Sequence, residues 1–149
     1  MKKVITIAIL TIFATISVNA TTPDKHRSSM SYLLEAISWV ESKHDPEAVG
    51  DNGNAVGAYQ IHKEYVDDVN RIYGTGFTYE DRKDPGTSKR MVRLYLRYYG
   101  ARYERITGKK ATVDILARIH NGGPNGWKKK ATIEYADKVV GVYLWLKSK

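Results

Sequence analysis

The chain has 149 residues, a formal net charge of +8 and no cysteine. This length suits one domain with a core of its own, and the missing cysteines exclude disulfides, thiol catalysis and zinc–thiolate sites. The excess of Lys and Arg favours binding to anionic surfaces, such as cell-wall polymers, lipid head groups or nucleic acid, without selecting among them.

Residues 1–20, MKKVITIAILTIFATISVNA, have the layout of a secretory signal peptide. Two lysines precede an apolar run from Val4 to Ile16, and small or polar residues follow up to Ala20. We expect cleavage near Ala20 and a secreted or periplasmic protein. A membrane anchor is the alternative, but the run is short for a stable span and no second one follows. The mature domain would span residues 21–149 with a net charge of +6, because two lysines and no acid are removed.

The remaining chain predicts about five helices joined by loops rich in Gly, Asn, Asp and Pro. From the spacing of apolar residues and the helix end signals, we expect helices at about residues 28–42, 61–73, 87–107, 113–120 and 132–146. A short hairpin around Asn52 and Gly53 fits the turn-forming loop that follows the first helix. The expected fold class is mainly α, with a single domain and at most a small hairpin.

Two details of the C-terminal half can be predicted more closely. The segment HNGGPNG at 120–126 should end the fourth helix, because two glycines and a proline cannot continue it. In the last helix, the residues expected to face inward are Ile133, Ala136, Val140 and Tyr143.

Glu41 lies on the apolar face of the first predicted helix, at its C-terminal end. At 100° per residue counted from Met30, Leu34 falls at about 40°, Ile37 at about −20° and Glu41 between them at about 20°. Partial burial and the negative end of the helix dipole both favour the protonated carboxyl, which suits a general acid. The alternative is a helix-end glutamate that turns to water or pairs with Lys43 or an arginine.

The loop behind Glu41 brings acidic residues back towards it. Asp45 and Asp51 are both within reach. A carboxylic acid with a second carboxylate about 5 Å away is the equipment of a retaining glycosidase. Asp51 also begins the favoured turn sequence Asp-Asn-Gly, so a role in the turn alone is the alternative.

Two parts of the sequence resemble the lysozyme and lytic transglycosylase superfamily. Glu41-Ser42, followed by AVG at 48–50 and GAYQI at 57–61, is similar to the front half of Slt-type transglycosylases. ARIHNGGPNG at 117–126 and TIEYADKV at 132–139 are similar to invertebrate-type (destabilase-like) lysozymes. The resemblance covers roughly residues 30–145 and implies a lysozyme-like domain.

The resemblance also implies roles for matching residues. Glu41 is the implied general acid, and Asp51 falls near the second carboxylate of the invertebrate type. In the Slt-type pattern that carboxylate is missing, and the acetamido group of the substrate helps instead. The candidate substrate-binding residues are Ser42, Tyr59, Gln60, His120, Asn121, Gly122 and Tyr135. For His120, bracing of the core or loop through a backbone hydrogen bond is the alternative role.

The sequence departs from the invertebrate type in its lack of cysteine. Those proteins are rich in disulfides, and Trp127 stands where their motif usually has a cysteine. The isopeptidase activity proposed for some destabilase-like members is put in doubt, because nothing in this sequence specifies its additional residues. The four histidines are scattered, so we expect no metal and no cofactor. No sequence-readable nucleic-acid motif occurs, so no nucleic-acid partner is expected.

These observations predict an exported muramidase that cleaves the β-1,4 bond between N-acetylmuramic acid and N-acetylglucosamine in peptidoglycan glycan strands. Capture by water would make it a lysozyme, which Asp51 favours slightly, and capture by the sugar's own hydroxyl would make it a lytic transglycosylase giving 1,6-anhydro ends. The alternative from another class is a non-catalytic wall-binding or cationic antimicrobial protein on the same fold. We expect a monomer, with a proteinaceous lysozyme inhibitor as a further candidate partner.

Overall fold

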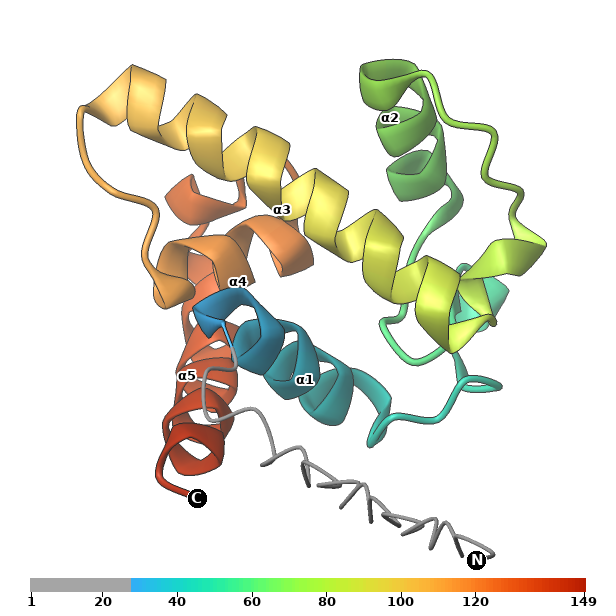
Figure 1. Cartoon of the computed structure of the whole chain (residues 1–149), viewed down its shortest axis with the longest axis horizontal. Coiled ribbons are helices and arrows are strands. Elements are labelled where there is room, and N and C mark those ends of the chain that lie inside the picture. The colour runs from blue at the N-terminus through green and yellow to red at the C-terminus, as the bar shows by residue number, and fades with distance from the viewer. Residues whose placement is uncertain (1–27) are drawn as a thin grey trace, which may run out of the picture.

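The computed structural model describes residues 28–149, and five α-helices form the body of this part of the chain (Figure 1). The helices are α1 (Ser29–Ser42), α2 (Lys63–Tyr73), α3 (Pro85–Thr107), α4 (Val113–Gly122) and α5 (Ile133–Lys147). Two short strands, β1 (Val49–Gly50) and β2 (Ala55–Val56), pair antiparallel between α1 and α2. The predicted mainly α fold with a small hairpin is confirmed. The predicted signal peptide, residues 1–20, lies outside the described residues.

Side-chain caps and left-handed residues set the ends of the helices. Ser28 accepts a hydrogen bond from the Ser31 amide at 3.2 Å, and Asp84 accepts one from the Thr87 amide at 2.6 Å. Each bond satisfies an amide that has no partner within its helix. Pro85 therefore begins α3, two residues earlier than predicted, because proline is favoured in the first helical turn.

The core lies where α1, α3, α4 and α5 meet. In Figure 1, α3 crosses the molecule as the longest helix, α4 lies beneath it, and α1 and α5 pack side by side. Core side chains no more than 1% exposed come from all four helices: Leu33, Leu34, Ile37, Met91, Leu96, Ile119 and Val139. Within residues 28–149, no helix is long and apolar enough to cross a membrane.

The fourth helix is two residues longer than predicted. It continues through Asn121 and Gly122, and Lys129 Nζ donates to the Gly122 carbonyl at 2.8 Å. The break comes at Gly123, whose φ of 78° is a conformation that glycine adopts far more readily than other residues. Asn121 is thereby carried on the last turn of a helix rather than on a loop.

The predicted inward face of α5 is wrong at its first position. Ile133 is 45% exposed, and α5 begins at that residue. Ala136, Val139 and Tyr143 form the buried stripe, and Val140 is only half-buried. The buried residues of α5 are thus three and four residues apart, as in the prediction, but Val139 takes the place predicted for Val140.

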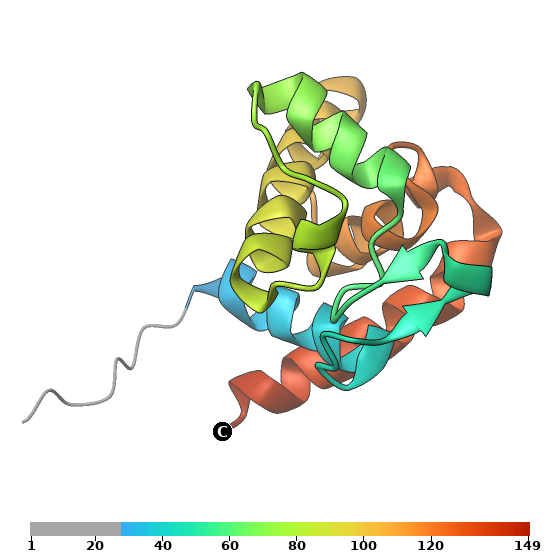
Figure 2. The same ribbon diagram turned by 90° about the vertical axis from the view of Figure 1, so that its right-hand side faces the viewer.

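The hairpin is fastened to the rest of the molecule by a buried arginine. Figure 2 shows the hairpin on the same side of the molecule as α2. Arg82, which is 5% exposed, donates from its guanidinium to the carbonyls of Asn54, Ile61 and Tyr79. Gly57 approaches the same segment so closely that a Cβ would lie 2.0 Å from the Arg82 carbonyl oxygen. The hairpin thus has a fixed base.

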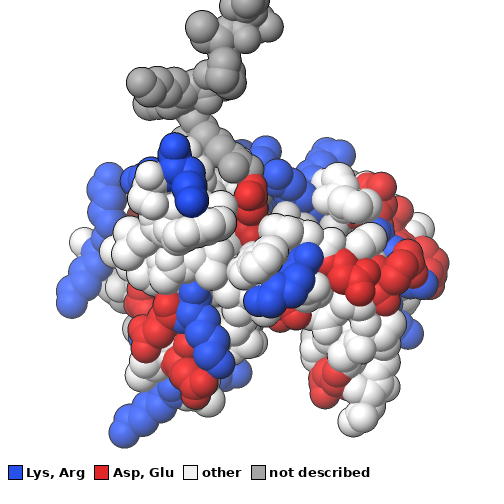
Figure 3. Space-filling model, turned by 90° about the horizontal axis from the view of Figure 1, so that it is seen from below, with Lys and Arg blue, Asp and Glu red and all other residues white. Residues whose placement is uncertain are grey.

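The basic side chains do not gather in one place on the face seen in Figure 3. Lys and Arg alternate there with Asp and Glu. A surface with both signs interspersed presents no single strong field to a partner. The net charge of +8 is a property of the whole chain, and this face carries both signs.

Candidate active site

A cleft of about 570 Å³ opens between the hairpin, α2 and the C-terminal end of α4. Its lining comprises Glu41, Asp51, Ala55, Gln60, His62, Glu64, Tyr65, Asp68, Tyr95, His120, Asn121, Gly123 and Pro124. Five of these were candidate site residues on sequence grounds: Glu41, Asp51, Gln60, His120 and Asn121. Segments about 80 residues apart in the chain therefore contribute to one concave surface.

Glu41 projects from the last turn of α1 into this cleft. Its side chain is 16% exposed, and its Oε1 accepts a hydrogen bond of 2.7 Å from the Tyr135 hydroxyl on α5. The same oxygen lies 3.4 Å from His120 Nε2 on α4. Lys43, a cation that could have paired with it, lies instead with Nζ 4.7 Å from the ring of Trp39. Glu41 is therefore a mostly buried carboxyl facing two potential hydrogen-bond donors.

Tyr135 remains a hydrogen-bond donor to Glu41 over the neutral range. Burial, followed by the charge of Glu41 and the hydrogen bond to it, raises the pKa of Tyr135 well above its ordinary value of 10. A phenol that keeps its proton can stabilise the carboxylate once Glu41 has given its own proton away. On sequence grounds, only the family resemblance indicated Tyr135 as a site residue.

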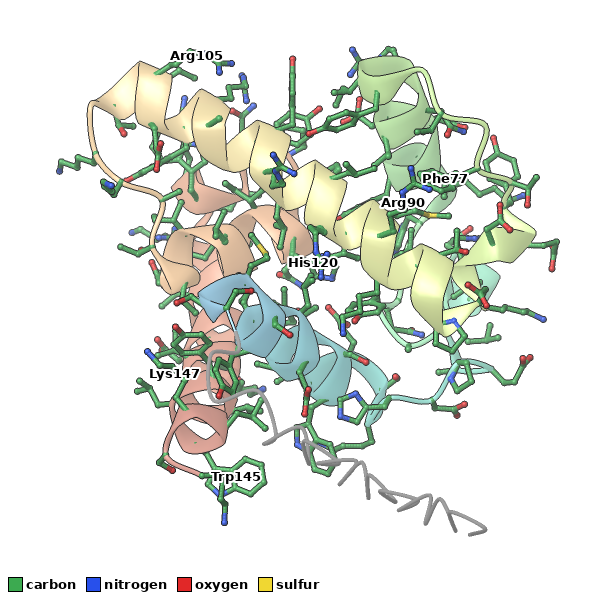
Figure 4. The ribbon with its side chains drawn as sticks, viewed as in Figure 1. Phe77, Arg90, Arg105, His120, Trp145 and Lys147 are labelled. Atoms are coloured by element: carbon green, nitrogen blue, oxygen red, sulfur yellow. The ribbon has the colours of Figure 1, made fainter. Side chains whose placement is uncertain are left out.

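Every helix contributes one side chain to the group around Glu41. His120 is 4% exposed, and its Nδ1 lies 3.4 Å from the hydroxyl of Tyr65 on α2. The Tyr65 ring in turn stacks on Tyr95 of α3, with 3.7 Å between centroids and 17° between planes. Figure 4 shows His120 near the centre of the molecule, between α4 and α1. A chain of side-chain contacts thus links the acid to the other four helices.

Tyr65 and Tyr95 were missed as site residues on sequence grounds. Both follow helical apolar spacing, and that pattern predicts only that they face the interior. The contact between Tyr65 and His120 joins positions 55 residues apart, so no local pattern could have indicated it. The sequence signal for Tyr65 and Tyr95 is that each is a tyrosine on the inward face of its predicted helix.

Asp51 lines the cleft from the turn of the hairpin. Its carboxylate is 58% exposed and lies 3.4 Å from His62 Nε2, whose ring is 45% exposed. Asp51 and Asn52 have φ angles of 47° and 52°, so the residue takes part in the turn and lines the cleft as well. Asp45, the other carboxylate expected within reach of Glu41, accepts from the Glu47 amide at 2.9 Å and does not line the cleft.

Unusual backbone conformations gather in the loop that connects Glu41 to α2. In the described part of the chain, five residues other than glycine have positive φ, and all fall between positions 43 and 60: Lys43, His44, Asp51, Asn52 and Gln60. Such conformations are uncommon outside glycine and cluster at functional sites. The loop therefore concentrates backbone strain beside the candidate acid.

Besides Tyr135, which donates to Glu41, three of the predicted substrate-binding residues do not line the cleft. The Ser42 hydroxyl donates to the Ala58 carbonyl at 3.1 Å, which ties the loop to the end of α1. Tyr59 is 4% exposed and belongs to the core, where burial, followed by the charge of Glu35, raises its pKa to about 12. Gly122 packs against Thr132, so closely that a Cβ would lie 2.6 Å from its Cγ2. These residues support the cleft from behind.

Gln60 lines the cleft and also holds its base together. Its Nε2 donates to the carbonyls of Ala48 and Gly57, at 3.2 and 3.0 Å. Its Oε1 leaves no room for a side chain at Gly50, where a Cβ would lie 2.3 Å away. Gln60 therefore bridges the start of the hairpin and the turn after it.

The cleft-lining carboxylates differ in how far they are engaged. Asp68 accepts a hydrogen bond from the Tyr99 hydroxyl and pairs with Arg71. Glu41 and Asp51 face His120 and His62 respectively. No group of three or more His, Asp or Glu side chains within residues 28–149 is arranged to hold a metal ion. The polar side chains that line the described cleft carry carboxyl, imidazole, phenol and amide groups.

Comparison with known proteins gives matches over much of the chain. Residues 19–137 match the family model described as Transglycosylase SLT domain. The chain is 36% identical over 84 residues to a protein of Magallana gigas named Lysozyme, and 34% identical over 83 residues to one of Ostrea edulis with the same name. Each match covers 56% of this chain and 56% of the relative, so the similarity spans about half the length of these proteins.

Proposed function

The chain belongs to the transglycosylase SLT domain family, and from this premise we propose that it degrades peptidoglycan by cleaving the β-1,4 bond between N-acetylmuramic acid and N-acetylglucosamine. The observation that carries the proposal is the Glu41 carboxyl, which is 16% exposed, lines the cleft and is held by Tyr135 at 2.7 Å. The name Lysozyme of both relatives agrees with a reaction on this class of glycan.

In the proposed reaction, Glu41 acts first as a general acid. Its carboxyl gives a proton to the glycosidic oxygen as the bond from that oxygen to the anomeric carbon breaks, and the leaving sugar departs as an alcohol. Positive charge then develops on the ring that retains the anomeric carbon. The Glu41 carboxylate, stabilised by the Tyr135 hydroxyl, next takes a proton from the incoming acceptor. The acid is thereby regenerated.

The acceptor decides between two products. We propose water as the acceptor, with Asp51 countering the developing positive charge, because Asp51 lines the same cleft as Glu41. The second candidate is capture by the hydroxyl of the muramic acid itself, which gives a 1,6-anhydro end. The description of the family favours this second outcome, as does the 58% exposure of the Asp51 side chain, which weakens its electrostatic effect.

Mass spectrometry of the soluble fragments released from purified peptidoglycan tests the proposal. Wild type is compared with Glu41→Gln, and Glu134→Gln serves as a matched control because Glu134 is an exposed glutamate next to Tyr135. Wild type and the control should release fragments, and Glu41→Gln should not. Reducing ends indicate hydrolysis, and ends lighter by one water indicate the anhydro product. Tight binding to the wall without any fragments would replace the enzyme by a wall-binding or cationic antimicrobial protein.

We propose export after cleavage near Ala20, because the substrate lies outside the cytoplasm and residues 1–20 have the layout of a signal peptide. The intact mass of protein recovered from the periplasm or medium tests this, since an uncleaved chain would retain the mass of residues 1–20. The proposed active form is a monomer, which light scattering coupled to gel filtration would establish or exclude. A proteinaceous lysozyme inhibitor, if present, would compete at the cleft.

A further inference from the structure

One buried titratable side chain is not used by the acid mechanism described above. His120 is 4% exposed, with Nε2 3.4 Å from Glu41 Oε1 and Nδ1 3.4 Å from the Tyr65 hydroxyl. A neutral imidazole carries its proton on only one of these nitrogens, so the two contacts depend on the tautomer. The groups that face His120 are Glu41 from α1, Tyr65 from α2 and Tyr135 from α5.

The Tyr65 hydroxyl contacts one of the two ring nitrogens whose protonation defines the tautomer of His120. Burial, followed by the neighbouring Tyr95 and Glu41, raises the pKa of Tyr65 well above 10, so its hydroxyl keeps its proton. His120 Nδ1 is the hydrogen-bond partner that the described residues give to this hydroxyl. The hydroxyl can donate to Nδ1 or accept from it, so the other ring nitrogen decides. Nε2 lies 3.4 Å from a carboxyl oxygen of Glu41, which favours the imidazole proton on Nε2 and leaves Nδ1 bare to accept from Tyr65.

With this tautomer, both donors around the acid converge on one of its two oxygens. The Tyr135 hydroxyl donates to Glu41 Oε1 at 2.7 Å, and His120 Nε2 lies 3.4 Å from the same atom. An oxygen that accepts one hydrogen bond and faces a second donor at 3.4 Å is a poor place for an acidic proton, because a proton there would face two others. The acidic proton is therefore favoured on Oε2.

We propose that Tyr65 and His120 are positioning residues that fix the Nε2–H tautomer and so hold the acidic proton of Glu41 on Oε2, the oxygen that delivers it to the glycosidic oxygen. After delivery, the two donors remain on Oε1 and stabilise the new carboxylate. The assignment of the tautomer does not depend on the proposed function. The delivery step rests on the proposed function.

Nitrogen NMR of the histidine rings tests the tautomer without any assay of activity. In protein labelled with ¹⁵N-histidine, long-range ¹H–¹⁵N spectra distinguish a protonated ring nitrogen from a bare one. His120→Gln identifies the His120 signals by their loss, and His44, whose Nδ1 lies 2.9 Å from Ser38 Oγ, provides an internal comparison. We expect His120 in the wild type to have a protonated Nε2 and a bare Nδ1. A protonated Nδ1 would overturn the proposal.

Kinetics on a soluble glycan oligomer test the consequence for the reaction. Tyr65→Phe keeps the ring on Tyr95 but removes the hydroxyl, and should lower kcat about tenfold with KM unchanged while the Nε2–H tautomer loses its dominance. Tyr98→Phe is the matched control, because Tyr98 is a half-buried tyrosine of α3 outside the cleft. An unchanged kcat with a changed tautomer would overturn the delivery step.

Rescue by a conservative variant separates positioning from a purely structural role. The amide of His120→Gln can still donate towards Glu41 and accept from Tyr65, whereas His120→Leu can do neither. We expect His120→Gln to retain kcat within about threefold and His120→Leu to lose about tenfold or more, provided that both unfold cooperatively. Equal losses would contradict the proposal. A wild type that releases no fragments would instead refute the proposed function and leave the NMR result standing.

Discussion

Two carboxyls of the cleft are held in different ways: Glu41 is held by side chains from two other helices, whereas Asp51 stands at the tip of a two-stranded hairpin. The first carboxyl is 16% exposed and faces Tyr135 and His120. The second is 58% exposed and faces only an exposed His62 among the ion pairs of the described residues. Long-range packing therefore determines the position of the acid, and local turn chemistry determines the position of its counterpart. Replacement of the Glu41 carboxyl by an amide should therefore lower activity more than the same replacement at Asp51.

The largest expected effect is the loss of activity in Glu41→Gln. The amide cannot give up a proton, so fragment release should fall by about 10³-fold or more, which corresponds to about 4 kcal/mol. Initial rates of fragment release, measured beside those of Glu134→Gln, give the ratio. A loss below about tenfold would mean that Glu41 is not the acid.

The next effect concerns the base of the hairpin. Arg82→Met should lower the free energy of unfolding by about 3–5 kcal/mol, because it leaves the carbonyls of Asn54, Ile61 and Tyr79 without their buried donor. Urea unfolding followed by circular dichroism measures the change. Arg90→Met, an exposed arginine whose guanidinium lies 5.5 Å from the ring centroid of Phe77, is the control and should cost less than about 1 kcal/mol (Figure 4). Similar losses in both variants would show that the hairpin does not depend on this anchor.

A smaller effect appears at high pH, beneath the same loop. Burial raises the pKa of Tyr59 to about 12, above its value of about 10 in an unfolded chain. The folded state therefore keeps a proton that the unfolded state loses, so stability is complete below pH 10 and falls as the pH rises towards 12. Tyr59→Phe should remove up to about 2–3 kcal/mol of this fall. The measurement is the free energy of unfolding at several pH values for wild type, Tyr59→Phe and the control Tyr98→Phe. An equal fall in stability in all three would show that Tyr59 is not its cause.

The smallest expected effect is that of Asp51→Asn. A half-exposed carboxylate stabilises a developing positive charge weakly, because water screens it, so activity should fall by about tenfold or less. The same fragment assay gives both the rate and the product. A loss as large as that of Glu41→Gln would mean that substrate binding buries Asp51 and makes it an equal partner. A shift from reducing to anhydro ends would show that Asp51 guides the water.

Local patterns in the sequence were sufficient for most of the helices and for the direction of Glu41. The cap at Ser28 and the glycine at position 74 mark helix ends with short-range hydrogen bonds, which is why they can be predicted. Glu41 is predictable for a related reason, since helical geometry places it between Leu34 and Ile37 whatever surrounds the helix.

Contacts between distant segments were beyond such patterns. Nothing near Tyr59 indicates that it faces the core rather than the cleft, because the turn that orients it depends on Gly57 and Arg82 meeting across the loop. The same holds for Tyr65, whose role comes from a histidine 55 residues away. Sequence reasoning finds the elements that carry the site. It does not find the side chains that hold one another in place.

The support of the hairpin by Arg82 has a consequence for how the cleft could diversify. All three groups that accept from its guanidinium are backbone carbonyls; Asn54 directly precedes β2, and Ile61 forms a bridge with Val56 of that strand. Carbonyls are the same in every residue, so this anchor places no demand on the side chains at 51–53. Among residues that tolerate the positive φ of positions 51–53, the tip could therefore exchange its side chains, and with them the glycans it accepts, while the scaffold beneath it remained unaltered.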